Sequence, residues 1–340
     1  MTTTYIYDGA HVRALDAPAA RPLRWAAWRP DGAHALIVGN RGHVLRFAPP
    51  AADGAAARFD VLATGSAHNL RGVAWSPDGA RALLVGNRGA VLLYEPPAPD
   101  TAAGSFAELP RVTGENLRRV AWSPDGSCAL LIGNGGCVLR YDAVTGGMQQ
   151  LPGDRAHTMR SIAWRPDGAY ALIGAYASRH AGYPRPYALY RCDGRFVQGI
   201  LATDDEDDAN AIDWQPASDP PRALILVARY GEDGALLPGK IVTYDGAGYS
   251  YRSIPRLVRA ADAARSPGDV VTLLGLGWHP SGEYALLCGE HGKLLAYDGR
   301  RMRLVSTGTN DNLVGPFWQP RAASPIALLL QGPDEKTYTV

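Results

Sequence analysis

The sequence predicts an all-β protein, and three observations lead to this fold class. A Trp-x-Pro motif occurs seven times, at Trp28, Trp75, Trp122, Trp164, Trp214, Trp278 and Trp318. Successive copies lie 40 to 64 residues apart, a range typical of repeat architectures. Each copy is followed by a short apolar run bounded by turn residues, as expected for a strand buried on both faces. Four antiparallel strands in each of seven repeats predict a single seven-bladed β-propeller over residues 1–340.

The best-preserved copy covers residues 75–94, WSPDGARALLVGNRGAVLLY, and predicts each element of a blade in order. The preceding LRGVAW is the expected first strand, which ends near Trp75. Ser-Pro-Asp-Gly predicts a tight turn, because Pro presets φ and Gly closes the turn. ALLVG is the second strand. Gly-Asn-Arg-Gly predicts a second reversal, in which Gly and Asn take positive φ. VLLY is the third strand, and a fourth, outer strand follows.

The repeated Trp-Ser-Pro-Asp-Gly motif resembles the WD-repeat superfamily and, within it, the TolB-like bacterial propellers. The resemblance extends over nearly the whole chain. The chain departs from standard WD repeats because Tyr141-Asp142 and Tyr297-Asp298 stand where a Trp-Asp pair would end the third strand. A Gly-His pair ahead of the first strand is also missing. The resemblance implies the propeller fold and points to no particular partner.

The two ends of the chain are expected to share the last blade. Residues 1–20 contain TYIYDGAHVRAL, a hairpin typical of the outer two strands, and residues 312–331 supply inner strands. Tyr7 precedes Trp28 by 21 residues, the same interval that separates Tyr297 from Trp318. Pairing of the two ends would close the ring and remove an open sheet edge. Because Tyr338 also fits a third-strand position, a two-plus-two and a three-plus-one division both remain open.

Composition narrows the class of protein. The formal net charge is +1, which gives no overall attraction to nucleic acid or to anionic membranes. The first residues lack the pattern of a signal peptide, and no apolar run approaches the ~18 residues of a membrane span. We therefore expect a cytoplasmic, monomeric protein, and the preference for Arg over Lys suggests a bacterial source.

The cysteines are expected to be core residues. Cys128, Cys137, Cys192 and Cys288 lie in or beside predicted strands, and no C-x-x-C spacing occurs. This pattern favours small buried side chains in a reducing compartment over a metal or redox site.

Three insertions distinguish the fourth to sixth repeats. The repeat from Trp164 carries 7 extra residues between its second and third strands, within SRHAGYPRPY, and the repeat from Trp214 carries 11, within RYGEDGALLPGK. A long loop before Trp278 includes residues 256–269, in which one short helix is expected. Antiparallel connectivity places all three on one face, and such insertions often mark the binding face of a repeat protein.

The candidate binding residues lie on this same face. Arg24, Arg71, Arg118 and Arg160 stand four residues before the Trp of the first four repeats, with Asn210 in the fifth. They could form a cationic crescent for an anionic group or an acidic partner, or each could bond to a neighbouring blade. The insertions add aromatic and cationic side chains typical of binding hot spots. The predicted binding set is Arg71, Arg118, Arg160, Arg179, His180, Tyr183, Arg185, Asn210, Tyr230 and His291.

Two further features carry alternative interpretations. Thr203–Asp208, TDDEDD, lacks the alternating acidic pattern of a calcium loop and is expected to be a solvated acidic loop. Trp25 replaces a small residue or Arg of the other repeats. It would either stack on a ligand or fill space in the blade closed by the two chain ends.

No catalytic pattern, phosphate loop, metal site or cofactor site is predicted from the sequence. The leading hypothesis is a non-enzymatic scaffold that binds a protein partner through the insertion-bearing face. Two alternatives remain open. One is a propeller enzyme of hydrolase or lyase type with its site at the channel mouth, and the other is a binder of a small anionic ligand or a glycan. A glycan binder would repeat an exposed aromatic pocket, whereas the repeated Trp leads directly into a buried strand.

Overall fold

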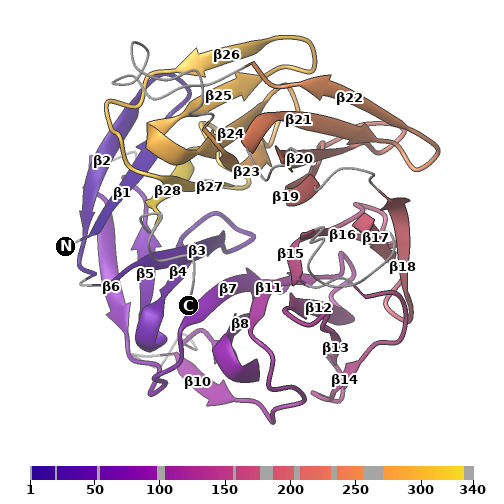
Figure 1. The fold of residues 1–340 in the computed structure, drawn as a ribbon. Coiled ribbons are helices and arrows are strands. Elements are labelled where there is room, and N and C mark those ends of the chain that lie inside the picture. Colours follow the sequence, from indigo (N-terminus) through magenta and orange to yellow (C-terminus); the bar gives the residue numbers. More distant parts are fainter. Residues whose placement is uncertain are drawn as a thin grey trace. The chain divides into compact units, whose positions relative to one another are not determined.

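The computed structural model describes residues 2–19, 21–51, 54–97, 104–155, 158–176, 187–202, 207–230, 236–255 and 271–332. In these ranges the regular structure is almost entirely antiparallel β-strand, joined by tight turns and short 3-10 turns (Figure 1). None of their helices is long and apolar enough to cross a bilayer. The chain divides into two compact units. Unit 1 comprises Met1–Gln150 and Phe317–Val340, and unit 2 comprises Leu151–Pro316.

Unit 1 contains, within the described residues, four sheets of four antiparallel strands, in the orders β3-β4-β5-β6, β10-β9-β8-β7, β11-β12-β13-β14 and β2-β1-β28-β27. The boundary with unit 2 falls inside β27. The strands are β1 (Thr2–Tyr7), β2 (Val12–Ala17), β3 (Leu23–Trp28), β4 (Ala35–Gly39), β5 (Val44–Ala48), β6 (Arg58–Leu62), β7 (Leu70–Trp75), β8 (Ala82–Gly86), β9 (Val91–Glu95), β10 (Ser105–Glu108), β11 (Leu117–Trp122), β12 (Cys128–Gly133), β13 (Val138–Asp142), β14 (Met148–Gln150), β27 (Leu313–Trp318) and β28 (Ala327–Gln331).

Unit 2 repeats the same plan with three groups of four strands in its described residues. A single bridge between Tyr176 and Asp208 joins the first two groups into one eight-stranded sheet. The strands are β15 (Thr158–Trp164), β16 (Ala171–Tyr176), β17 (Tyr187–Cys192), β18 (Val197–Ala202), β19 (Asp207–Trp214), β20 (Ala223–Tyr230), β21 (Leu236–Tyr244), β22 (Tyr249–Ser253), β23 (Leu273–Trp278), β24 (Ala285–Gly289), β25 (Leu294–Tyr297) and β26 (Met302–Val305).

The Ser-Pro-Asp-Gly turn forms as the sequence predicts. In the second repeat, the Gly79 N–H donates to the Ser76 carbonyl at 2.8 Å, and Gly79 takes a φ of 68° that glycine adopts without steric cost. The Asp78 carboxylate accepts the Ser76 hydroxyl and the Ala80 N–H. These hydrogen bonds lower the pKa of Asp78, with that from Ser76 contributing most. The Asp of the motif is therefore a turn residue.

The second reversal differs from the sequence prediction in one respect. Gly-Asn-Arg-Gly forms a 3-10 turn, η2 (Asn87–Gly89), in which positive φ falls on Arg88 and Gly89 and not on Asn87. Asn87 cannot take that role because it opens the turn: its N–H donates to the Asn69 carbonyl at 2.9 Å. The same turn recurs as η1 (Asn40–Gly42) and η4 (Glu290–Gly292).

The repeated Trp belongs to the core. All seven first strands end at their Trp, and five of these side chains are 6–8% exposed. The indole N–H of Trp122 donates to the Ala74 carbonyl of the preceding sheet at 3.2 Å, and Trp214 bonds in the same way to Ala163 at 3.2 Å. Trp28 donates likewise to the Phe317 carbonyl at 2.9 Å. Each of these Trp residues therefore fastens its sheet to the one before it.

The cysteine prediction is confirmed. All four cysteines are buried and carry free thiols. Cys288 donates its S–H to the Gly315 carbonyl at a Sγ–O distance of 3.1 Å. Burial raises the pKa of this thiol, which keeps it in the unreactive, protonated form.

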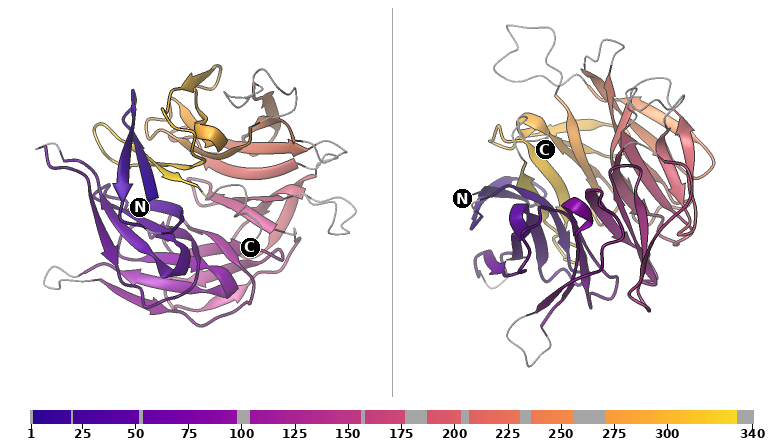
Figure 2. Two further views of the ribbon diagram at one scale, coloured as in Figure 1. Left: turned by 60° about the vertical axis from the view of Figure 1, so that its left-hand side comes forward. Right: turned by 60° about the horizontal axis from the view of Figure 1, so that its bottom comes forward.

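The two chain ends share one sheet. β1 pairs antiparallel with β28, from Thr4 opposite Leu330 to Tyr7 opposite Ala327, and β2 lies outside β1. Figures 1 and 2 show the two terminal pairs, indigo and yellow, side by side. In the described residues, two strands come from each end. Tyr338, which left a three-plus-one division open, lies outside them.

Replacement of Trp122 by Ala should destabilise the protein by about 3–5 kcal/mol, because it removes a large buried side chain from between two sheets. Trp122→Phe should cost less, since it loses mainly the indole hydrogen bond, worth about 1 kcal/mol. Chemical denaturation measures both. Val144→Ala, at a position that is 90% exposed, is the control, and an equal effect of Trp122→Ala and Val144→Ala would contradict a core role.

Deletion of residues 1–17 should cause aggregation, because it removes β1 and β2 and leaves the main-chain groups of β28 as an open sheet edge. Size-exclusion chromatography with light scattering measures the outcome. Val144→Ala, at a position that is 90% exposed, is the control and should leave the protein in its original oligomeric state. If the variant that lacks residues 1–17 keeps the oligomeric state and the melting temperature of the parent, β1 is dispensable.

Candidate functional site

The side of each sheet that carries the turn between its second and third strands is called here the turn side. Hydrogen bonds place the loop into the next sheet's first strand on this same side. The Arg88 N–H donates to the Asn116 Oδ1 at 3.0 Å, and the His291 N–H donates to the Asn312 Oδ1 at 3.2 Å. The second-to-third-strand turns and the entry loops therefore lie together, as antiparallel connectivity predicts.

In unit 1 the repeated Arg side chains hold these turns. The Arg118 Nε donates to the Asn134 Oδ1 at 2.6 Å, and the Arg24 Nε donates to the Asn40 Oδ1 at 3.1 Å. Arg71 makes the same bond to Asn87. Each Arg thus binds the turn of its own sheet.

Trp25 has a packing role in unit 1. Its ring meets Phe317 edge-on, with 4.7 Å between ring centroids. The Arg119 guanidinium carbon lies 3.6 Å from the Trp25 ring centroid, and the Arg119 Nη1 donates to the carbonyls of Arg71 and Arg118, each at 2.7 Å. Of the two sequence interpretations, these contacts favour space filling beside the chain-end sheet.

Unit 2 departs from this pattern at the position of the turn Asn, twelve residues after the Trp. Tyr176 and Glu290 replace Asn there in the repeats from Trp164 and Trp278. Arg160 therefore contacts a Tyr ring where the Arg residues of unit 1 contact the Asn amide. Its guanidinium carbon lies 4.4 Å from the Tyr176 ring centroid, a cation–π contact. Glu290 Oε2 instead accepts the Thr272 N–H at 3.0 Å.

Tyr230, at the end of β20, is the centre of a mixed cluster. Burial raises its pKa to about 12, and the neighbouring Asp208, Tyr176 and Glu290 add to the rise, while Arg160 opposes it. We call Arg160, Tyr176, Asp208, Tyr230 and Glu290 the Tyr230 cluster. The structure thus brings the predicted Arg160 and Tyr230 together with Asp208, from the predicted acidic loop, and with Tyr176 and Glu290, which the sequence did not single out. Replacement of the turn Asn by Tyr or Glu was the signal that could have identified two of them.

The other predicted residues fall in three groups. Asn210 donates its Nδ2 to the Leu273 carbonyl at 3.3 Å, so it joins β19 to β23, and His291 follows Glu290 in η4 with a φ of 52°. Arg71 and Arg118 lie in unit 1. Four predicted residues lie outside the described residues: Arg179, His180, Tyr183 and Arg185. The short helix expected within residues 256–269 also lies outside them.

The expectation of a solvated acidic loop is wrong for its last two residues. Asp207 and Asp208 begin β19, and Asp207 is completely buried. Asp207 forms an ion pair with Lys240, and its Oδ1 lies 3.8 Å from the Arg229 Nε. These two cations compensate for the burial of the carboxylate. Both come from strands further along the chain, so local sequence could not reveal them. Residues 203–206 lie outside the described residues.

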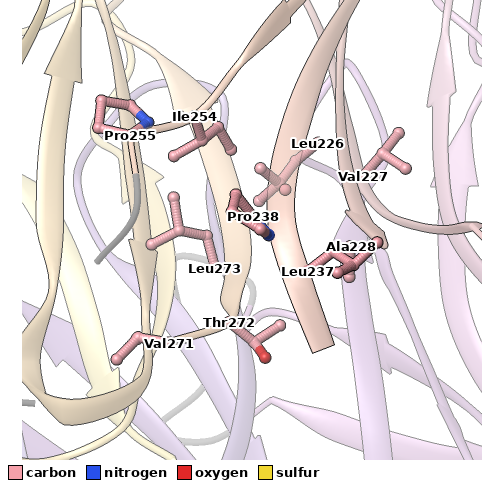
Figure 3. A pocket seen from close by; sticks show the side chains of 11 residues that line it. Leu226, Val227, Ala228, Leu237, Pro238, Ile254, Pro255, Val271, Thr272 and Leu273 are labelled. Carbon is pink, nitrogen blue, oxygen red and sulfur yellow. The ribbon is translucent and has the colours of Figure 1, made fainter. Parts of the chain in front are cut away.

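A small apolar hollow lies between β20, β21 and β23 in unit 2 (Figure 3). Its volume of ≈ 10 Å³ is about that needed by one water molecule, so it is too small for an organic ligand. The described residues also contain no group of three or more His, Cys, Asp or Glu side chains placed to hold a metal ion. The hollow is lined by Leu226, Val227, Ala228, Leu237, Pro238, Gly239, Ile254, Pro255, Val271, Thr272 and Leu273.

Comparison with known proteins shows the fold. No known family model matches the chain, and no curated protein matches it. Among solved structures, hydrazine synthase of Kuenenia stuttgartiensis is similar with a TM-score of 0.62 at 14% identity, over 86% of this chain and 80% of that one. YCF48 bound to a D1 peptide is similar with a TM-score of 0.60 at 16% identity, over 95% and 96% of the two chains. Both are β-propeller proteins, and this chain has the β-propeller fold.

The bond between Arg118 and Asn134 should contribute to stability, so Arg118→Ala and Asn134→Ala should not be additive. A double-mutant cycle from urea denaturation should give a coupling of about 1.5–3 kcal/mol, the net value of a hydrogen bond with one charged partner. Arg195→Ala combined with Asn134→Ala is the control cycle, since Arg195 is exposed and lies in unit 2. Additive effects in the first cycle would show that the Arg118 bond adds no stability.

Proposed function

We propose that this protein is a non-enzymatic, seven-bladed propeller that binds a protein or peptide partner through the turn side of unit 2. The seven Trp-x-Pro repeats and the pairing of β1 with β28 support a ring closed by the two chain ends. Closure would leave no open edge at the join between the first and last repeats.

The Tyr230 cluster is the observation that carries the proposal. In unit 1, Arg71 and Arg118 are each bonded to a turn Asn, whereas in unit 2 the corresponding Arg160 rests on an aromatic ring. Tyr and Arg are the side chains most enriched in binding hot spots. Tyr176 and Tyr230 are half-buried and offer ring surface for stacking. The Arg, Asp and Glu side chains of the cluster add hydrogen-bond donors and acceptors.

The insertions begin beside this cluster. Tyr176 is the last described residue before residues 177–186, and Tyr230 is the last before residues 231–235. Loops on a rigid scaffold concentrate binding residues. We therefore include the insertion residues in the proposed surface, namely Arg179, His180, Tyr183 and Arg185, together with Asn210 and His291.

One of the two similar structures agrees with this class of function. YCF48 was solved with a bound peptide, and peptide binding on a propeller of the same size is an analogy at the level of fold.

Peptides selected from a random display library on the full chain provide the test. Tyr230→Ala and Arg160→Ala should each weaken the binding of a selected peptide by about 5- to 30-fold, which corresponds to a hot-spot loss of about 1–2 kcal/mol. Isothermal titration calorimetry measures the affinity, and thermal melting checks that each variant is folded.

Tyr251→Ala and Arg195→Ala are the matched controls. Tyr251 is 79% exposed on the outer strand β22 of the same unit, and Arg195 is exposed in the turn between β17 and β18. Both should keep the peptide affinity within about twofold, as for positions outside a hot spot. Peptides that lose affinity in the controls but not in the cluster variants would place the binding surface elsewhere.

A further inference from the structure

The residue before the repeated Trp is acidic in one repeat, whereas it is Gly277 in the sixth and Phe317 in the seventh. It is Ala27, Ala74, Ala121 and Ala163 in the first four repeats and Asp213 in the fifth. Asp213 lies near the end of β19, the innermost strand of its group of four. The sequence motif alone gives no reason for an acid at this position. At the same position, Ala74 and Ala163 use only their main-chain carbonyls, which accept the indole N–H of Trp122 and of Trp214.

The Asp213 carboxylate joins two strands through main-chain hydrogen bonds. Its Oδ2 accepts the N–H of Trp278 in β23 at 2.8 Å, and its Oδ1 accepts the N–H of Trp214 at 3.0 Å. The buried indole N–H of Trp278 has no hydrogen-bond partner among the described residues. The Asp213 carboxylate therefore links β19 to β23 by a side-chain hydrogen bond. At the junctions of Trp122 and Trp214, the indole N–H makes the corresponding link to the preceding group of strands.

The surroundings of Asp213 contain little charge in the part of the chain that the structure describes. β23, LLGLGW, carries no titratable side chain, and Leu224 stands opposite Asp213 on β20. On the other strands packed against β19, the titratable side chains are Arg160, Tyr176, Tyr187, Tyr190, Arg191, Cys192, Arg229 and Tyr230.

Two of these groups lie away from the carboxylate, whereas Arg191 is closer to it. The Arg191 guanidinium carbon lies 4.1 Å from the Tyr170 ring centroid, and the Tyr170 ring meets that of Trp214 edge-on at 6.0 Å between centroids. Asp208, opposite Tyr176, and Asp207, opposite Arg229, stand at the start of β19, about 15–20 Å along the strand at ~3.3 Å per residue. None of these side chains is among the causes of the Asp213 shift. His279, which follows Trp278, contacts Ser281 and stacks on Tyr284.

Burial sets the titration of this carboxyl group. Desolvation raises the pKa of Asp213 to about 6, and the two N–H groups only partly oppose it. The group therefore changes charge close to neutral pH, in a range where ordinary Asp side chains are ionised.

We propose that Asp213 is a pH-sensitive joint between β19 and β23. When ionised, the carboxylate accepts both N–H groups and holds β23 through Trp278. A protonated carboxyl has one good acceptor oxygen, so protonation weakens one of the two bonds and loosens the junction locally.

The same titration has the opposite effect on global stability. Because the pKa in the folded protein lies above the ordinary 3.8, the folded state binds the proton more tightly than the unfolded state does. The contribution of Asp213 is therefore fully present below pH ~4 and is lost as the pH rises through ~6. A tighter junction and a lower global stability at neutral pH form a pair of effects that a purely structural Asp would not give.

Selective ¹⁵N labelling of Trp provides the test, because the chain has only 8 Trp residues. Between pH 4.5 and 8, the backbone amides of Trp278 and Trp214 should shift with a common midpoint near 6, moving downfield as the carboxylate forms. Asp213→Asn, which keeps the shape and one acceptor oxygen, should abolish this titration and leave any contribution of His279 in place. A Trp278 amide that does not respond, or that responds equally in Asp213→Asn, would overturn the proposal.

Thermal melting of the same two proteins gives a second readout. Asp213→Asn should melt at a higher temperature than the parent at pH 8, because it removes a partly buried charge, and the difference should shrink toward zero at pH 4.5. A lower melting temperature of the variant at pH 8 would show that the ionised group stabilises the fold, and the proposal would be wrong.

Discussion

The packing of a Trp side chain between neighbouring sheets is the interaction on which the rest of the structure depends. Each first strand ends at this residue, so the indole lies where the strand turns into Ser-Pro-Asp-Gly. Its ring packs edge-on against the aromatic residue of the third strand, at 5.7 Å between centroids for Trp122 and Tyr141. Where its N–H also bonds to the preceding sheet, one side chain sets the position of three strands. A four-stranded sheet alone could not bury both of its faces, so the repeats stabilise one another.

On the turn side, the two units differ in the side chains that surround the repeated Arg. In unit 1, Arg and Asn side chains bond to one another and to the main chain of the turns. In unit 2 the turn Asn is absent from the described repeats, and Tyr, Arg and carboxylate side chains take its place around Tyr230. The strand β23 lies next to both features of unit 2. Thr272, the residue before it, donates its N–H to Glu290 of the Tyr230 cluster, and Trp278, its last residue, donates its N–H to Asp213. A change at the Asp213 joint would therefore act on an element that also borders the Tyr230 cluster.

Local sequence predicted the parts of the fold that depend on neighbours along the chain. The ends of the first strands, the Ser-Pro-Asp-Gly turns, the buried cysteines and the pairing of the two chain ends follow from periodicity and from turn chemistry. The residue with positive φ was assigned wrongly, because the role of Asn87 depends on bonds to Asn69 and Arg71. The burial of Asp207 was missed because Lys240 comes from a strand 33 residues away. Of the candidate site, Arg160 and Tyr230 were identified by position, whereas Glu290 and Asp208 act through contacts that only the folded chain brings together.

The pairing of β1 with β28 has a consequence for synthesis of the protein in the cell. Ala327, the partner of Tyr7 in β28, is made 320 residues after it. At a translation rate of roughly 5–20 residues per second, β1 waits on the order of 16–64 s before β28 exists. During that interval the Tyr5-Ile6-Tyr7 segment, buried in the finished sheet, can pair only with β2, and its other side is an open strand edge on a nascent chain. Its sheet is thus the last to be completed, and the N-terminal hairpin is the segment with most need of a chaperone.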